Sequence, residues 1–261
     1  MRIARIEVDG AARYATVVDD GFSLIEGDIF GDWTETGQVM AMHEAKLLAP
    51  VDPPQIVAIG LNYKRHAVES GMAIPALPLL FVKTSNTITG TDCPVILPRI
   101  APNEVDYEVE LVIVIGKECK NVAEADVDDY ILGYTIGNDV SARDCQLKID
   151  KQWARGKCFD TFAPIGPWIE TELDGDSTDI SLTLNGETMQ DSNTSDLVFS
   201  CRELVSFISQ NMTLAPGSII MTGTPEGVGF GRKPPVFLQA GDVMSATIAG
   251  IGTLRNQVVA E

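Results

Sequence analysis

Residues 106–115 read DYEVELVIVI, a stretch that joins a group of carboxylates directly to a continuous apolar run. The apolar residues 111–115 are typical of a strand that is covered on both faces. Successive side chains of a strand point to opposite faces, so Glu108 and Glu110 should present their carboxylates on one face. The stretch therefore predicts a buried strand that begins beside two neighbouring negative charges.

A third carboxylate is expected to join this pair, because Asn138 and Asp139 lie in a second apolar stretch. Uncompensated carboxylates in a core are costly or take up protons, and a divalent cation is the common remedy. An all-oxygen ligand set favours Mg²⁺ or Mn²⁺ over Zn²⁺ and leaves roughly three octahedral positions for water or substrate. We predict a metal site formed by Glu108, Glu110 and Asp139. The competing interpretation is a solvated Glu-x-Glu on an edge strand.

Composition narrows the range of partners and compartments. The chain has 261 residues, of which 45% are hydrophobic and 21% charged, as in ordinary globular proteins. A net charge of −18 repels phosphate backbones and anionic membrane surfaces, so we expect neither nucleic acid nor membrane as a partner. Five cysteines without a CxxC pair indicate a reducing compartment. Without a signal peptide or an 18-residue apolar span, a cytoplasmic enzyme is expected, or a mitochondrial one whose transit peptide has been removed.

Strand patterns outnumber helical ones along the chain. Residues 1–50 predict a small N-terminal β unit, and prolines at 50, 53 and 54 separate it from a catalytic domain over 51–261. Helices are expected before Gly71 and over 201–210. No regular alternation of helix and strand appears, so we predict an α+β, β-rich fold with a mixed β-roll or barrel. Its strands are expected at 56–59, 79–83, 109–115, 133–138, 180–184, 219–222 and 243–248.

His66 and Glu69 are candidates for acid–base chemistry. They lie three residues apart on the short helix before Gly71, so their side chains can form a hydrogen bond. A carboxylate that holds an imidazole makes a general base suited to neutral pH. The competing interpretation is a packed His66 beside a solvated Glu69. His43, the other histidine, is interpreted as structural.

Cations and glycines supply further candidates. Arg143, Lys157 and Lys83 are expected to gather in one pocket around the metal, although Arg143 paired with Asp144 or Asp139 is an equally open alternative. Gln146 could donate amide hydrogen bonds to a ligand. The glycine-rich turn 222–229 could hold a carboxylate through hydroxyl and amide groups. It lacks the Gly-Lys-Ser/Thr of a phosphate-binding loop, which argues against nucleotide binding.

Over roughly residues 50–261 the chain resembles the fumarylacetoacetate hydrolase superfamily. Six blocks occur in the family's order: 60–63 with His66 and Glu69, 81–83, 106–111, 138–146, 156–167 and 222–229. The resemblance implies a β-rich roll, commonly a homodimer, that uses Mg²⁺ or Mn²⁺ to hold the enolate of a small 2-oxo acid. It implies metal ligands Glu108, Glu110 and Asp139, catalytic residues His66, Glu69 and Lys157, and substrate-binding residues Arg143, Gln146, Thr224 and Lys83.

The resemblance supports more than one reaction. Hydrolysis of acylpyruvates or decarboxylation of oxaloacetate is the first expectation, with water activated by His66. A tautomerase or isomerase of oxaloacetate or a 2-hydroxy-dienoate is the alternative, and a non-catalytic binder of dicarboxylates is the third. The short N-terminal unit disfavours true fumarylacetoacetase activity. Cys158 stands where many relatives carry a small hydroxyl residue, and no nucleophilic role is assigned to it.

Overall fold

The computed structural model describes residues 1–150 and 152–261, and strands dominate both parts. The N-terminal strands are β1 (Arg2–Val8), β2 (Ala11–Val18), β3 (Gly21–Gly27), β4 (Trp33–Ala41) and β5 (Lys46–Leu47). The next strands are β6 (Ile56–Gly60), β7 (Leu79–Lys83), β8 (Ile88–Thr89), β9 (Val95–Leu97), β10 (Val105–Asp106), β11 (Val109–Ile115) and β12 (Ile131–Asn138). The last are β13 (Ser141–Ala142), β14 (Ala163–Glu170), β15 (Asp179–Leu184), β16 (Glu187–Asn193), β17 (Ile219–Met221), β18 (Val243–Ile248) and β19 (Gly252–Ala260).

Helices are short and lie around the strands. The α-helices are α1 (Lys64–Ser70), α2 (Ala154–Lys157) and α3 (Cys201–Asn211). A π-helical segment, η4, covers Asp144–Ile149, and 3₁₀ turns occur at η1 (Met42–Glu44), η2 (Ser85–Thr87), η3 (Glu124–Asp129), η5 (Thr194–Asp196) and η6 (Gly229–Gly231). The β-rich α+β fold predicted from the sequence is confirmed.

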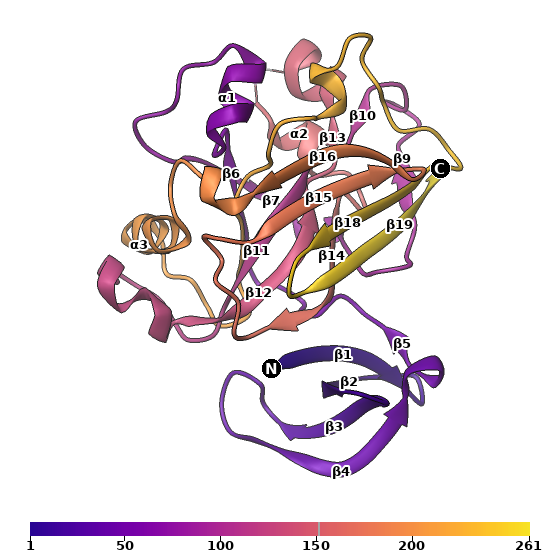
Figure 1. The fold of residues 1–261 in the computed structure, drawn as a ribbon, viewed down its shortest axis with the longest axis vertical. Helices are drawn as coiled ribbons and strands as arrows, with labels where there is room; N and C mark the ends of the chain where they lie inside the picture. The colour runs from indigo at the N-terminus through magenta and orange to yellow at the C-terminus, as the bar shows by residue number, and fades with distance from the viewer. Residues whose placement is uncertain (151) are drawn as a thin grey trace.

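Two sheets enclose the main core. The larger has the order β4-β3-β2-β1-β14-β12-β11-β17-β6-β7, and the smaller has the order β16-β15-β18-β19-β9. Strands β15 and β18 of the smaller sheet lie against β11 and β12 of the larger one, as Figure 1 shows. Every residue of β11 is buried, since apolar side chains cover both of its faces. This confirms the doubly covered strand predicted from residues 111–115.

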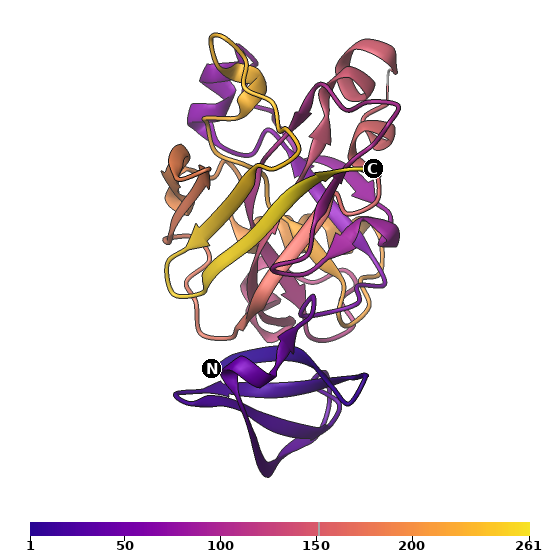
Figure 2. The same cartoon turned by 90° about the vertical axis from the view of Figure 1, so that its right-hand side faces the viewer.

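The N-terminal strands form a lobe at one end of the molecule (Figures 1 and 2). Strand β1 pairs with β14 of the body through Arg2 with Glu170 and Ile3 with Ile169, so the large sheet continues into the lobe. Ile6 and Phe22 belong to a small core of the lobe's own. The domain boundary after residue 50 stays a prediction.

Antiparallel pairing of β11 with β12 positions the chemistry. Val109, at the start of β11, faces Asn138, at the end of β12. The residues beside these two positions therefore meet at one edge of the core, and helix α1 lies near the same end of the body (Figure 1). The cap of α1 is Gly71, whose φ of 67° is the left-handed conformation that glycine adopts without strain.

Candidate active site

The three predicted metal ligands come together. Glu108 and Glu110 flank the start of β11, and Asp139 follows the end of β12, where its backbone N–H donates to the Glu108 carbonyl over 2.8 Å. One carboxylate oxygen from each residue lies within 4.8 Å of the others. Glu108 is 6% exposed, and Glu110 and Asp139 are each 1% exposed. The alternative of a solvated Glu-x-Glu is therefore wrong.

Cations neutralise Glu108 and Asp139. Lys157 Nζ donates to Glu108 Oε2 over 2.7 Å and to Asp139 Oδ2 over 2.5 Å. Arg143 Nη2 donates to Glu108 Oε1 over 2.6 Å. Burial acts to raise the pKa of Glu108, but Lys157 and Arg143 outweigh burial and bring it down to about 2. Glu108 is therefore ionised at any ordinary pH.

Glu110 is in the opposite situation. Its Oε2 accepts from the Gly223 backbone N–H over 2.9 Å, and within 1–150 and 152–261 no cation pairs with it. Burial, and then the negative charges of Asp139 and Glu108, raise the pKa of Glu110 well above its usual value. The cluster therefore retains one carboxylate that needs positive charge. Three buried oxygen ligands with this deficit fit a hard divalent cation such as Mg²⁺ or Mn²⁺.

Lys83 and Lys157 both lie beside Asp139, but only one reaches the cavity. Lys83 Nζ donates to Asp139 Oδ1 over 2.6 Å, its side chain is fully buried, and it lies outside the cavity lining. Burial lowers the pKa of Lys83 despite Asp139. Burial would also lower the pKa of Lys157, but Asp139 and Glu108 raise it. Lys83 therefore orients Asp139 through this ion pair. That Lys83 also binds the substrate stays a prediction.

Arg143 occupies the floor of the cavity with Gln146. Its Nε donates to Asp106 Oδ2 over 2.8 Å, and its Nη2 forms an ion pair with the same oxygen at 2.7 Å. Its Nη1 donates to Gln146 Oε1 over 2.9 Å. Arg143 therefore pairs with Asp106 and Glu108, and not with Asp144 or Asp139 as the alternative predicted. Because the Gln146 oxygen is used by Arg143, its NH₂ group is the part available to a ligand. Asp106 was missed in the sequence because no spacing rule linked it to Arg143.

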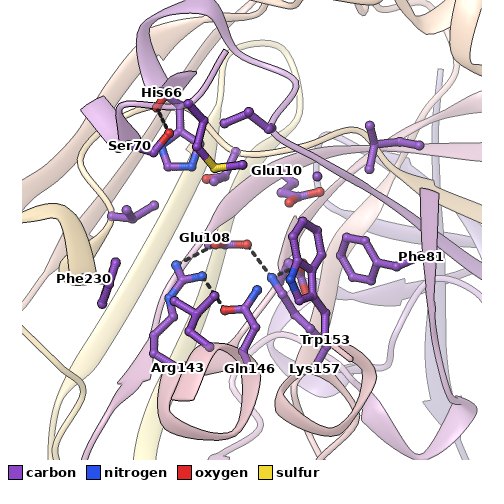
Figure 3. A pocket seen from close by; sticks show the side chains of 18 residues that line it. His66, Ser70, Phe81, Glu108, Glu110, Arg143, Gln146, Trp153, Lys157 and Phe230 are labelled. Atoms are coloured by element: carbon purple, nitrogen blue, oxygen red, sulfur yellow. Dashed lines mark hydrogen bonds and ion pairs between the residues drawn. The ribbon is translucent and has the colours of Figure 1, made fainter. Parts of the chain in front are cut away.

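His66 and Glu69 form the predicted pair. His66 Nδ1 lies 2.8 Å from Glu69 Oε2, and Glu69 Oε1 accepts from the Gly227 N–H over 2.9 Å. Burial acts to raise the pKa of Glu69, but these two hydrogen bonds lower it. Figure 3 shows His66 on the side of the cavity opposite Arg143 and Lys157, with Glu108 between them. Because Nδ1 is occupied, Nε2 is the nitrogen available to a ligand.

Thr224 lines the cavity, but its hydroxyl is already engaged. Oγ1 donates to the Val109 carbonyl over 2.9 Å and accepts from Gln190 Nε2 over 2.7 Å. Gln190 Oε1 also accepts from the Val109 N–H over 2.9 Å. Gln190 and Thr224 therefore fix the backbone between the two glutamates. Gln190 was missed because the strand that carries it, β16, has a mostly polar sequence.

The cavity has a volume of about 140 Å³. Its size is similar to the ~150 Å³ of a cavity that holds benzene, so it suits a small ligand. Apolar and aromatic side chains make up most of the rest of its wall: Ile59, Leu61, Met72, Phe81, Leu147, Trp153, Val228 and Phe230. Lys157 Nζ lies 5.3 Å from the centre of the Phe81 ring, a cation–π distance. Cys158 and His43 lie outside this lining.

Comparisons with known proteins agree with this geometry. The family model described as "Fumarylacetoacetate (FAA) hydrolase C-terminal" matches residues 55–259, and one described as "Rv2993c-like, N-terminal" matches residues 1–50. The chain therefore belongs to the fumarylacetoacetate hydrolase family, as the resemblance indicated. Members of this family are enzymes that include hydrolases and tautomerases or isomerases.

Particular relatives give finer detail. The "Fumarylacetoacetate hydrolase domain-containing protein 2 homolog" of Dictyostelium discoideum is 50% identical, over 83% of this chain and 75% of that protein. "Oxaloacetate tautomerase Fahd2a, mitochondrial" of Rattus norvegicus is 44% identical, over 83% of this chain and 70% of its own. A structure titled "5-carboxymethyl-2-hydroxymuconate delta-isomerase" from Mycobacterium smegmatis matches with a TM-score of 0.91 and 42% identity over the whole of both chains.

The described residues contain no candidate membrane-spanning helix. Across 1–150 and 152–261, every helix is too short or too polar to cross a bilayer.

Proposed function

We propose that the chain is a metal-dependent tautomerase of small 2-oxo acids that carry a β-carbonyl or β-carboxylate group, with oxaloacetate as the first substrate to test. One observation carries the proposal: the imidazole of His66, oriented by Glu69, faces Arg143 and Lys157 across a cavity of about 140 Å³. Relatives named as a tautomerase and an isomerase support it, since both names describe a relocation of a proton.

The reaction moves one proton from carbon 3 to the oxygen on carbon 2, with no other change in the atoms. His66 Nε2 takes the proton from carbon 3, because Nδ1 is bound to Glu69, and the protonated imidazole then returns a proton through water to the oxygen on carbon 2. Lys157, kept charged by Asp139 and Glu108, stabilises the negative charge that develops on the oxygen. The Gln146 NH₂ group, oriented by Arg143, donates to a substrate oxygen.

We also propose that Mg²⁺ or Mn²⁺ is held by Glu108, Glu110 and Asp139. When bound, the ion supplies positive charge beside the oxygens of the 2-oxo acid. We propose further that the enzyme works as a cytoplasmic homodimer. Light scattering coupled to size exclusion tests the assembly: a mass near twice 28.1 kDa is expected, and a mass near 28.1 kDa contradicts it.

The deciding experiment is proton NMR of metal-stripped protein with oxaloacetate in deuterated buffer, with and without Mg²⁺ and corrected for the reaction of the metal alone. We expect protein- and Mg²⁺-dependent exchange of the carbon 3 protons. His66→Ala should reduce this exchange by about a hundredfold or more, because it removes the base. Exchange at the wild-type rate in that variant would remove His66 from the mechanism.

Hydrolysis of acylpyruvates is the second candidate, favoured by the same His66–Glu69 pair, which can activate a water molecule as well as a carbon acid. The cavity volume favours short acyl groups. Acetylpyruvate and fumarylpyruvate in the same NMR assay separate the two candidates. Mg²⁺-dependent cleavage without faster oxaloacetate exchange would replace the tautomerase with the hydrolase.

A further inference from the structure

Asp106 has a buried carboxylate that collects N–H donors from three segments of the chain. Its Oδ1 accepts from the backbone N–H groups of Tyr107 and Gly229, each over 2.8 Å. Its Oδ2 accepts from the Phe230 N–H over 3.0 Å and from Arg143 Nε over 2.8 Å, and it forms an ion pair with Arg143 Nη2 at 2.7 Å. The residue is fully buried. A single carboxylate thus joins the cation on the cavity floor to the loop that carries Phe230.

That loop, Gly227–Phe230, is held at both ends by carboxylates. At one end the Gly227 N–H donates to Glu69, the partner of His66. At the other end, a Cβ atom on Gly229 would come within 1.9 Å of the Val236 carbonyl oxygen and within 2.6 Å of Asp106 Oδ1. Only glycine allows this approach. The loop therefore links the carboxylate that orients His66 to the carboxylate that orients Arg143.

We propose that Asp106 is a positioning residue that, through Gly227–Phe230, sets the separation between His66 and Arg143 and the width of the cavity. Val228 and Phe230 of this loop line the cavity, so a shift of the loop changes the space for the ligand. The proposal rests on the proposed function in taking a 2-oxo acid as the ligand. Four N–H donors and an ion pair with Arg143 require a carboxylate at this position, since an amide would turn its own N–H groups toward some of the donors.

The test compares Asp106→Asn with Glu104→Gln. Glu104 is a matched control, because its ion pair with Lys148 links the same two segments over 2.5 Å, with side chains that are 25% and 56% exposed. The probe is oxalate, titrated calorimetrically into Mg²⁺-loaded protein, alongside kcat and KM for oxaloacetate. In Asp106→Asn we expect the oxalate Kd and the oxaloacetate KM to rise at least tenfold, since hydrogen bonds to charged groups are lost. Glu104→Gln should match the wild type.

A purely structural role gives a different result. If Asp106→Asn lowers Tm but keeps the wild-type oxalate Kd and kinetics, the proposal is overturned. If that variant does not fold, hydrogen exchange of the wild type decides: the Gly229 and Phe230 amides should be protected, and rapid exchange at both contradicts the anchoring. If the wild type does not turn over oxaloacetate, the proposed function fails, while the oxalate comparison still tests Asp106.

Discussion

The two sides of the carboxylate cluster are neutralised very differently. Glu108 and Asp139 contact the side-chain nitrogens of Arg143, Lys157 and Lys83. Glu110, within residues 1–150 and 152–261, accepts only the backbone N–H of Gly223. With Asp106 included, four carboxylates face three cations in the described residues, so the cluster carries one net negative charge when Glu110 is ionised. A divalent ion reverses that sign. The protein side chains alone would repel an anionic 2-oxo acid, and the loaded site would attract it.

Removing a cation that neutralises Glu108 and Asp139 should give the largest loss of activity and stability. Lys157→Met removes the cation shared by Glu108 and Asp139 and leaves both carboxylates buried without it. We expect at least a hundredfold loss of kcat/KM, and destabilisation of about 3–5 kcal/mol, as for other broken buried ion pairs. Urea denaturation and the NMR exchange assay measure both quantities. A variant with wild-type stability would show that the pair is not the main source of neutralisation.

Changing the other side should leave folding intact. Glu110→Gln removes the carboxylate without a cation, so the metal-free variant should be as stable as the wild type or more stable. Its Mg²⁺ affinity should fall by about 10–100-fold or more, because one charged ligand is lost. Calorimetric titration of Mg²⁺ and urea denaturation in EDTA test the two parts. Unchanged Mg²⁺ affinity would exclude Glu110 as a ligand.

The pH dependence of stability should distinguish Glu110 from Glu108. The raised pKa of Glu110 means that the folded protein holds this proton more tightly than the unfolded chain, so its stabilisation is lost as pH rises above about 4.3. The pKa of Glu108 is lowered to about 2, which has the opposite effect on stability. The stabilisation from ionised Glu108 is lost as pH falls from about 4.3 toward 2. In EDTA, the stability of Glu110→Gln relative to the wild type should therefore increase above about pH 4.3. A constant difference between pH 4 and 8 would contradict the unpaired carboxylate.

An exposed ion pair should give the smallest effect. Arg202 and Asp128 are joined at the surface, where their side chains are 55% and 60% exposed. Water and salt screen such a pair, so Arg202→Ala should leave both the urea midpoint and Mg²⁺ affinity unchanged within error. This variant is the baseline for Lys157→Met. A comparable destabilisation in both would show that burial does not decide the cost of losing a cation.

The strands that position the metal ligands could be predicted from sequence because burial on both faces leaves an unmistakable apolar run. The bounds predicted for β11, β7 and β18 match the structure. Strand β14 was missed because Pro164 and Pro167 interrupt it, and proline usually argues against a strand inside a sheet. Strand β19 was missed because the buried Asn256 breaks its apolar alternation.

Site residues could be predicted as far as local spacing reaches. His66 with Glu69, and Glu108 with Glu110, needed only the periods of a helix and a strand. The partner of Arg143 could not be predicted, because Asp106 is brought to it by the pairing of β10 with β13. The hydrogen bond that the Thr224 hydroxyl accepts comes from Gln190, which lies on a polar strand of the second sheet. Contacts between sheets therefore mark the limit of the sequence-based argument.

The origin of the ligands on two strands also has a consequence for folding. Glu108 and Glu110 are near neighbours in the chain, so an unfolded chain already offers both, but Asp139 joins them only when β11 and β12 have paired. The complete ligand set therefore exists only in conformations that contain this hairpin. Mg²⁺ present during refolding would favour conformations with the correct β11–β12 register, since a slip of one residue would move Asp139 away from Glu108 and Glu110.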